Sequence, residues 1–220
     1  MDLILVILGI ILIIVLYYFL SSGETTVLSN KLDLSIPQTS IPKEKISEPS
    51  SRKYSYEMWL YGYNFNASSN YIVSRASSSS GKNIGLKFDT SSPKLILEYT
   101  ATGATKTVPI TDNFPLQTWT HLIVSVDDKY IDVYMNGKLI KSVQDSSIET
   151  PNADATIDYG IVNCYLAKLS RSVLPTDPQT AWDKYSAGNG ENPFSKYLSN
   201  FGLTMTLQKN NQDYSKVTLF

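Results

Sequence analysis

The sequence is poor in the residues from which disulfide frameworks, metal sites and nucleophilic catalytic sites are usually built. Its 220 residues include one cysteine and one histidine. A single cysteine excludes an internal disulfide and a multi-cysteine metal site, and Cys164 is expected to be a small buried hydrophobic residue. A calcium loop of the D-x-D-x-D-G type is missing too. With a net charge of -1, the chain has no overall attraction to nucleic acid. We therefore expect no cofactor, no metal site and no nucleic-acid partner.

Paired catalytic carboxylates are also missing. Two carboxylates spaced two residues apart on one strand would project into the same groove, as glycan hydrolysis requires, but no Glu-x-Asp-x-Glu occurs. Asp127 and Asp128 are adjacent in a predicted turn, and Asp132 has only tyrosines beside it on its face. The one histidine, His121, has no convincing serine or cysteine partner for a triad. We expect no catalytic residues, and we expect that the chain is not an enzyme.

One long apolar run stands at the start of the chain. Residues 3–20 read LILVILGIILIIVLYYFL, without a charge or a proline. As a helix rising about 1.5 Å per residue, this run matches the thickness of a hydrocarbon core, and its aromatic end suits the headgroup boundary. The predicted membrane-anchoring residues are Leu3, Ile4, Leu5, Val6, Ile7, Leu8, Ile10, Ile11, Leu12, Ile13, Ile14, Val15, Leu16, Tyr17, Tyr18, Phe19 and Leu20.

A cleaved signal peptide is the alternative interpretation of this run. It lacks the basic residues that normally precede such a segment, although Ser21-Ser22-Gly23 would serve as a cleavage site. The nearby basic residues all follow the run, which favours a cytosol-facing C-terminal side, and an unpaired cysteine agrees with that reducing side. We predict a single-pass transmembrane anchor over residues 1–23. A flexible tether rich in Ser and Pro is predicted over residues 24–53, with one short strand at residues 31–37.

Strand signals repeat from residue 54 onward, separated by clusters of Gly, Asn, Asp and Ser. Strands are predicted at residues 54–61, 71–75, 84–88, 94–99, 105–109, 120–126, 130–135, 138–143 and 161–169. A short helix is expected near residues 178–186, with Thr176 or Asp177 as its cap and Pro178 in its first turn. A last hairpin is expected over residues 203–220. The pattern is typical of an all-β antiparallel sandwich over residues 54–220.

The clearest local pattern lies between residues 119 and 143, WTHLIVSVDDKYIDVYMNGKLIKSV. Leu122, Val124 and Val126 recur at every second position, which predicts one core-facing side of a strand. Asn136-Gly137 favours the two positive φ angles of a type I′ turn between two strands.

These residues carry a resemblance to a known family. The run Trp119-Thr120-His121, the strand and acidic turn that follow, and VYMNGKL at residues 133–139 resemble the hairpins of laminin-G-like, concanavalin A-like jelly rolls. YSYEMWL at residues 54–60 is similar to an early core strand of that family, and residues 164–185 to its closing strand and short helix. The resemblance covers about residues 54–188. It implies a concanavalin A-like jelly roll with Trp59 and Trp119 in or near the core.

Tyrosine is frequent, with fifteen residues against seven phenylalanines. Such side chains can stack on sugars or form a protein contact surface. In the terminal hairpin, alternate apolar residues either close the sandwich or offer an edge to a partner. The candidate partner or glycan surface consists of Tyr61, Tyr63, Tyr130, Tyr134, Leu203, Met205 and Leu207.

The leading functional hypothesis rests on a resemblance in architecture. Small single-span proteins with one such domain resemble minor structural proteins of large icosahedral DNA viruses that have an internal membrane. This implies a non-enzymatic minor capsid protein in the virion inner membrane, facing the capsid and linking that membrane to other structural proteins. The alternatives are a lectin-like, carbohydrate-binding module on a membrane anchor and a degenerate glycan hydrolase.

Overall fold

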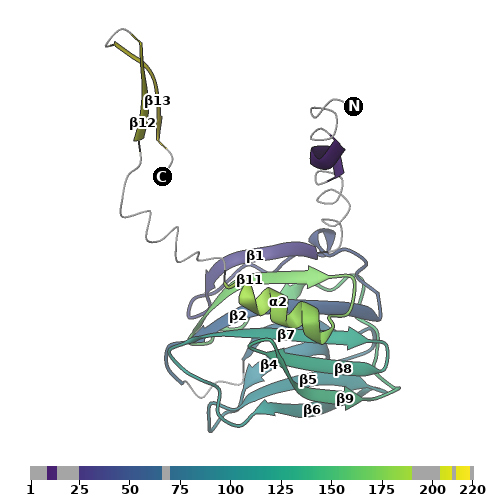
Figure 1. Ribbon diagram of the computed structural model, residues 1–220. Helices are drawn as coiled ribbons and strands as arrows, with labels where there is room; N and C mark the ends of the chain where they lie inside the picture. The colour runs from purple at the N-terminus through teal and green to yellow at the C-terminus, as the bar shows by residue number, and fades with distance from the viewer. Residues whose placement is uncertain (1–8, 14–24, 66–69, 190–203, 210–211, 219–220) are drawn as a thin grey trace.

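The computed structural model describes residues 9–13, 25–65, 70–189, 204–209 and 212–218. Two antiparallel sheets form a sandwich (Figure 1). Sheet A comprises, in spatial order, β1 (Thr25–Asp33), β11 (Cys164–Ser172), β2 (Lys53–Gly62), β7 (Trp119–Asp127), β8 (Tyr130–Met135) and β9 (Lys138–Gln144). Sheet B comprises β10 (Ile157–Asp158), β3 (Tyr71–Ala76), β4 (Lys82–Phe88), β5 (Leu95–Ala101) and β6 (Ala104–Thr111). The predicted antiparallel sandwich is confirmed.

The main core lies between the two sheets and follows the period-two patterns of their strands. On β7, Leu122, Val124 and Val126 are buried in it, as predicted. Cys164 is also buried there, and burial raises the pKa of its thiol to about 12. The predicted strand at residues 161–169 lies instead at Cys164–Ser172. Its pairing with β2 begins at Cys164 and continues to Ser172, whereas the backbone N–H of Val162 donates to the Leu34 carbonyl and takes no part in that pairing.

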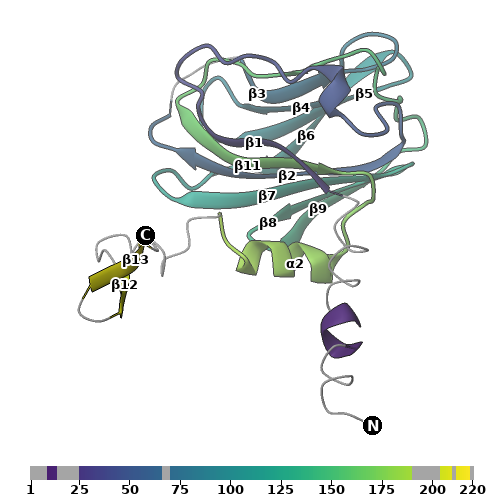
Figure 2. The ribbon, with the colours of Figure 1, turned by 90° about the horizontal axis from the view of Figure 1, so that it is seen from above.

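A helix adds a third layer on the outer face of sheet A. Figure 2 shows α2 (Pro178–Ser186) lying beside sheet A on the side away from sheet B. Asp177 caps the helix by accepting hydrogen bonds from the backbone N–H groups of Gln179 and Thr180. Thr176, the other predicted cap, is buried and bonds to the Ser55 hydroxyl instead. The predicted helix is therefore confirmed, with Asp177 as its cap.

The turn between β8 and β9 has the predicted conformation. Asn136 and Gly137 have φ angles of 50° and 75°, as a type I′ turn requires. The Asn136 side-chain oxygen accepts a hydrogen bond of 2.9 Å from the backbone N–H of His121. The backbone N–H of Asn136 donates to the His121 carbonyl at 2.9 Å. The turn is thus tied to the start of β7.

The predicted flexible tether is wrong from residue 25 to residue 53. β1 pairs with β11 along the edge of sheet A. After β1, Leu34, Ile41 and Ile46 are buried in the main core, on either side of the 3-10 helix η1 (Lys43–Lys45). The prediction failed because a polar edge strand and its loops bury only a few side chains. Their composition is therefore the same as that of a tether. Only residues 21–24 separate the apolar run from β1.

The predicted membrane anchor lies mostly outside the described residues. Of its apolar run, residues 9–13 are described, and they are helical. Ile10, Ile11, Leu12 and Ile13 are exposed there. In the described part of the chain, no helix is both long enough and apolar enough for a membrane span. The anchor therefore stays a prediction.

The terminal hairpin forms its own small sheet. β12 (Thr204–Lys209) and β13 (Gln212–Thr218) pair with each other, and neither belongs to sheet A or sheet B. The predicted hairpin is confirmed, and its described strands do not close the sandwich. Met205 and Leu207 stand opposite Val217 and Ser215 in its register. Leu203 lies outside the described residues.

Candidate functional site

Aromatic residues from three neighbouring strands meet on the outer face of sheet A. Tyr61 on β2 stands opposite both Tyr165 on β11 and Trp119 on β7. Their chain neighbours Leu60 and Leu166 are buried in the core, so alternation directs these aromatic rings to the opposite face. The ring centroid of Tyr61 lies 5.5 Å from that of Trp119 and 6.2 Å from that of Tyr165.

A fourth ring completes this cluster. The Tyr63 ring lies 5.3 Å from that of Tyr165. We call Tyr61, Tyr63, Trp119 and Tyr165 the aromatic row; each is partly exposed. The neighbouring rings lie tilted to one another, and each keeps part of its surface exposed, so the row offers several aromatic contacts rather than one.

Polar groups border the aromatic row. The Lys31 ammonium lies 6.0 Å from the Trp119 ring centroid, a distance at which cation–π attraction operates. The Tyr63 hydroxyl donates to the Asn163 side-chain oxygen at 3.5 Å, and the Asn163 amide donates to Asn64 at 2.6 Å. The row therefore combines apolar ring faces with amide and ammonium groups at its rim.

Farther along the outer face, α2 covers a second aromatic group. Trp59 is 6% exposed; its ring stacks on Tyr185 of α2 at 5.9 Å and lies 4.9 Å from the His121 ring. The predicted burial of Trp59 is confirmed, but Trp59 lies between sheet A and α2 rather than between the sheets. Trp119, expected in or near the core, is instead partly exposed in the aromatic row.

Charged contacts fix α2 to sheet A beside Trp59. The Glu57 carboxylate lies 3.3 Å from His121 Nε2 and 3.1 Å from the Lys184 ammonium. Burial alone would raise the pKa of Glu57, but the His121 hydrogen bond and the Lys184 charge together hold it below its ordinary value. These groups bond to one another across the helix–sheet contact, so their role is to position α2.

A groove runs between α2 and the β8–β9 hairpin. Its volume is about 410 Å³, and it is lined by Met135, Asn136, Lys138, Ile140, Trp182 and Tyr185. Trp182 is 47% exposed, and its ring lies 5.7 Å from that of Tyr185. Tyr185 also contacts Trp59, so the groove borders the aromatic group under α2.

The structure brings together only some of the tyrosines of the predicted partner or glycan surface. Tyr61 and Tyr63 lie together in the aromatic row. Tyr134 is buried beneath the segment that leads into α2, where its hydroxyl donates to the Thr176 carbonyl at 3.2 Å, and burial raises its pKa. Tyr130 is exposed, but at the β7–β8 turn, the opposite end of sheet A. Sequence reasoning missed Tyr165, although its alternation with buried Cys164 and Leu166 was a usable signal.

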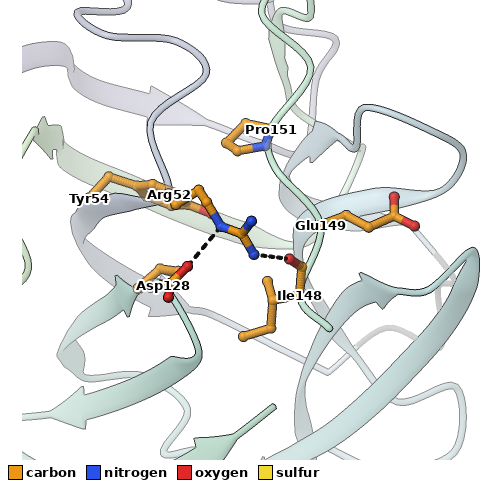
Figure 3. A pocket seen from close by; sticks show the side chains of 7 residues that line it. Arg52, Tyr54, Asp128, Ile148, Glu149 and Pro151 are labelled. Atoms are coloured by element: carbon orange, nitrogen blue, oxygen red, sulfur yellow. Dashed lines mark hydrogen bonds and ion pairs between the residues drawn. The ribbon is translucent and has the colours of Figure 1, made fainter. Parts of the chain in front are cut away.

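The acidic residues at the β7–β8 turn are engaged in surface ion pairs. Asp127 lies 2.9 Å from the Lys53 ammonium, and Asp128 lies 2.8 Å from Arg52 Nε. Arg52 also donates to the Ile148 carbonyl at 3.0 Å (Figure 3). The Arg52 side chain thereby bridges the turn and the segment after β9. Nowhere in the described ranges do three or more His, Cys, Asp or Glu residues gather as a metal site would require.

A laminin-G family model, described as the concanavalin A-like lectin/glucanases superfamily, matches residues 37–160, more than half of the chain. The chain belongs to this superfamily. The match begins before residue 54, in agreement with the structure, in which residues 37–53 are part of the domain. Among curated proteins, no match to the sequence is found.

Solved structures of this superfamily's fold resemble the chain at low identity. The receptor-binding domain of botulinum neurotoxin D has a TM-score of 0.58 and 14% identity, over 74% of this chain and 45% of its own. The binding domain of Paraclostridial mosquitocidal protein 1 has a TM-score of 0.57 and 14% identity, over 75% of this chain and 46% of its own. Trypanosoma rangeli sialidase has a TM-score of 0.52 and 12% identity, over 64% and 24%. This chain thus spans less than half of each, and the likeness shows the fold alone.

Proposed function

We propose that this chain is a membrane-anchored, non-enzymatic carbohydrate-binding module and that the aromatic row is its glycan site. The observation that carries the proposal is the register of Tyr165, Tyr61 and Trp119 across three adjacent strands. One face of a pyranose ring consists largely of C–H groups, and it packs against an aromatic ring as other apolar groups do. The sugar hydroxyls then point to the sides, where polar groups can bond to them.

The dimensions of the row favour a linear glycan over a single sugar. Its ring centroids are spaced by 5.3 to 6.2 Å, so successive sugars of one chain would each meet a ring. Asn64 and Asn163 at one side supply amide donors and acceptors, and Lys31 supplies an ammonium donor at the other. Membership of a superfamily that includes lectins supports this proposal, as does the likeness in fold to two receptor-binding or binding domains.

The proposal is tested by binding of the full-length protein, in detergent, to an array of glycans. Tyr61→Ala and Trp119→Ala should each weaken binding about tenfold, since a stacked aromatic contact contributes about 1.4 kcal/mol. Tyr61→Phe should keep the affinity, because the ring remains. Tyr130→Ala is the matched control: this tyrosine is exposed on the same sheet at the other end. If no glycan binds, or if the control weakens binding as much as Tyr61→Ala, the proposal is wrong.

A structural role in a virion inner membrane, linking that membrane to a capsid, is the second candidate. Two observations favour it. Residues 21–24 would hold the sandwich within about 14 Å of the membrane surface, which suits a protein that joins two layers. The groove beside α2 exposes Trp182, and exposed Leu139 lies on the neighbouring β9; exposed aromatic and aliphatic groups of this kind occur at protein interfaces.

The second candidate predicts a different sensitivity to substitution. Trp182→Ala and Leu139→Ser should reduce incorporation of the protein into purified particles, while Tyr61→Ala should not. Membrane fractionation and protease protection of the full-length protein would locate the domain. Incorporation that depends on Tyr61 rather than on Trp182 would instead assign the contact to the aromatic row.

A further inference from the structure

The groove between α2 and the β8–β9 hairpin leaves apolar surface uncovered. Met135 and Ile140 line it from the hairpin, and Trp182 and Tyr185 line it from α2. Trp182 is 47% exposed, and within α2 only Ala181 is buried. A short helix is stabilised chiefly by the packing of its apolar side chains. α2 therefore has apolar surface still available for a further contact.

The chain leaves α2 at the edge of this groove. Tyr185 lines the groove, and it stands four residues before Asn189, the last described residue of this part of the chain. Four residues span at most about 14 Å. Gly188 follows the helix with a φ of 74°, as is common at helix C-termini, and its carbonyl accepts a hydrogen bond of 2.8 Å from the Lys168 ammonium. The next segment therefore starts at a fixed point close to the groove.

That next segment has an apolar stripe at helical spacing. Residues 190–203 lie outside the described residues, and their sequence is GENPFSKYLSNFGL. Its large apolar residues recur at i, i+3, i+4 and i+7, the spacing of one face of an amphipathic helix; they are Phe194, Tyr197, Leu198 and Phe201. Asn192-Pro193 before the stripe is a helix start signal, and Gly202 after it is a stop signal. The sequence alone therefore predicts an amphipathic helix over residues 193–201.

We propose that residues 193–201 of this chain dock into the groove as an amphipathic helix antiparallel to α2. The connection, residues 187–192, has a usual length for two neighbouring helices. As a helix the segment is about 14 Å long, which matches α2, itself a helix of nine residues. Docking buries the apolar stripe of the segment together with the exposed Trp182 ring.

The short connection also favours this occupant over a separate protein. A segment tethered so closely meets the groove at an effective concentration on the order of millimolar. The inference is independent of the glycan site, because the aromatic row lies outside the groove. It bears on the second candidate function, since a groove that the chain itself fills offers no Trp182 contact to a capsid protein.

Hydrogen exchange of the full-length protein in detergent, followed by mass spectrometry, tests the docking. Backbone amides of residues 194–201 should exchange at least about tenfold more slowly than in a synthetic peptide of residues 190–203. Trp182→Ala removes the exposed ring from the groove and should abolish this protection. Tyr61→Ala alters the aromatic row instead and should keep it. Equal exchange in protein and peptide would overturn the proposal, as would protection that survives Trp182→Ala or that Tyr61→Ala abolishes.

Cross-linking locates the segment without weakening the contact. The one natural cysteine, Cys164, is buried, so a short bismaleimide can join Lys138→Cys, an exposed position of the groove lining, to Leu198→Cys. The matched control pairs Leu198→Cys with Tyr130→Cys, at the other end of β8. The groove pair should give an intramolecular product and the control pair should not. Equal yields from the two pairs would contradict the docking, and a product of dimer size would assign the segment to the groove of a second copy and contradict the proposal.

Discussion

Gly137 in the β8–β9 turn is expected to be sensitive to substitution for two separable reasons. Its φ of 75° disfavours any residue with a Cβ atom. A Cβ at this position would also lie 3.0 Å from Trp182 Cε3, 3.1 Å from Trp182 Cα and 3.2 Å from Tyr185 Cβ. Since Trp182 Cα is backbone, relief of this contact requires α2 itself to move.

The magnitude follows from adding the two effects. Alanine at positive φ costs about 1 kcal/mol, and forcing an atom into an occupied contact costs about 1 to 3 kcal/mol. Gly137→Ala should therefore lower the free energy of unfolding by about 2 to 4 kcal/mol. Urea denaturation followed by circular dichroism and tryptophan fluorescence measures this loss.

Gly103 offers a matched control in the β5–β6 turn. The two turns have nearly the same backbone, with φ values of 50° and 74° at Thr102 and Gly103. At Gly103, however, no atom of the described residues lies within 4 Å of an added Cβ. Gly103→Ala should cost only the backbone contribution of about 1 kcal/mol. Equal losses in the two variants would refute the packing of α2 on the β8–β9 turn, and no loss in either would refute the turn conformation.

Four further outcomes are expected. Trp59→Ala should lower the free energy of unfolding by about 3 to 5 kcal/mol in urea titrations; a loss below about 1 kcal/mol would contradict its burial under α2. The pKa of Glu57 is lowered in the folded protein, so Glu57 stabilises the fold above its ordinary pKa of 4.5, and this stabilisation is lost as the pH falls through the pKa of the folded protein. Glu57→Gln should therefore make the free energy of unfolding decline less steeply with falling pH, and an unchanged decline would assign the pH dependence to other groups. Removal of residues 1–23 should give a detergent-independent protein with a β-type circular dichroism spectrum, whereas a soluble full-length monomer would contradict the anchor. Double substitution of Asp127 and Asp132 should leave glycan binding intact. If the wild-type protein hydrolysed a glycan and the double variant did not, the protein would be an enzyme.

The strands of the sandwich were predictable where their pattern is local. On β7 and β8 every second residue faces the core, and Asn136-Gly137 fixes the turn between β8 and β9, so neighbouring residues suffice to identify these strands and their hairpin. β1 has no such signal. Its partner β11 begins at Cys164, far along the chain, and an edge strand needs few apolar residues because it has only one neighbouring strand.

The candidate site could not be assembled from sequence because its members come from distant strands. Alternation directs Tyr61 and Tyr165 away from the core, but only the order β11-β2-β7 brings them beside Trp119. The position of α2 was equally inaccessible. It covers the outer face over Tyr134 and leaves Tyr61 partly exposed. The alternation of residues along either strand shows that both tyrosines face outward but not which of them the helix covers.

The early start of β1 changes what a membrane anchor would mean for this protein. A tether through residue 53 would let the domain turn freely, whereas residues 21–24 extend over at most about 14 Å. The sandwich would then be held with the end that carries Thr25 toward the bilayer. The nine residues of β1 span about 26 Å, and its other end, Asp33, pairs with Tyr165 of the aromatic row. The row would therefore lie at the end of the domain away from the membrane, where a glycan or an assembled protein layer can approach it and lipid headgroups cannot.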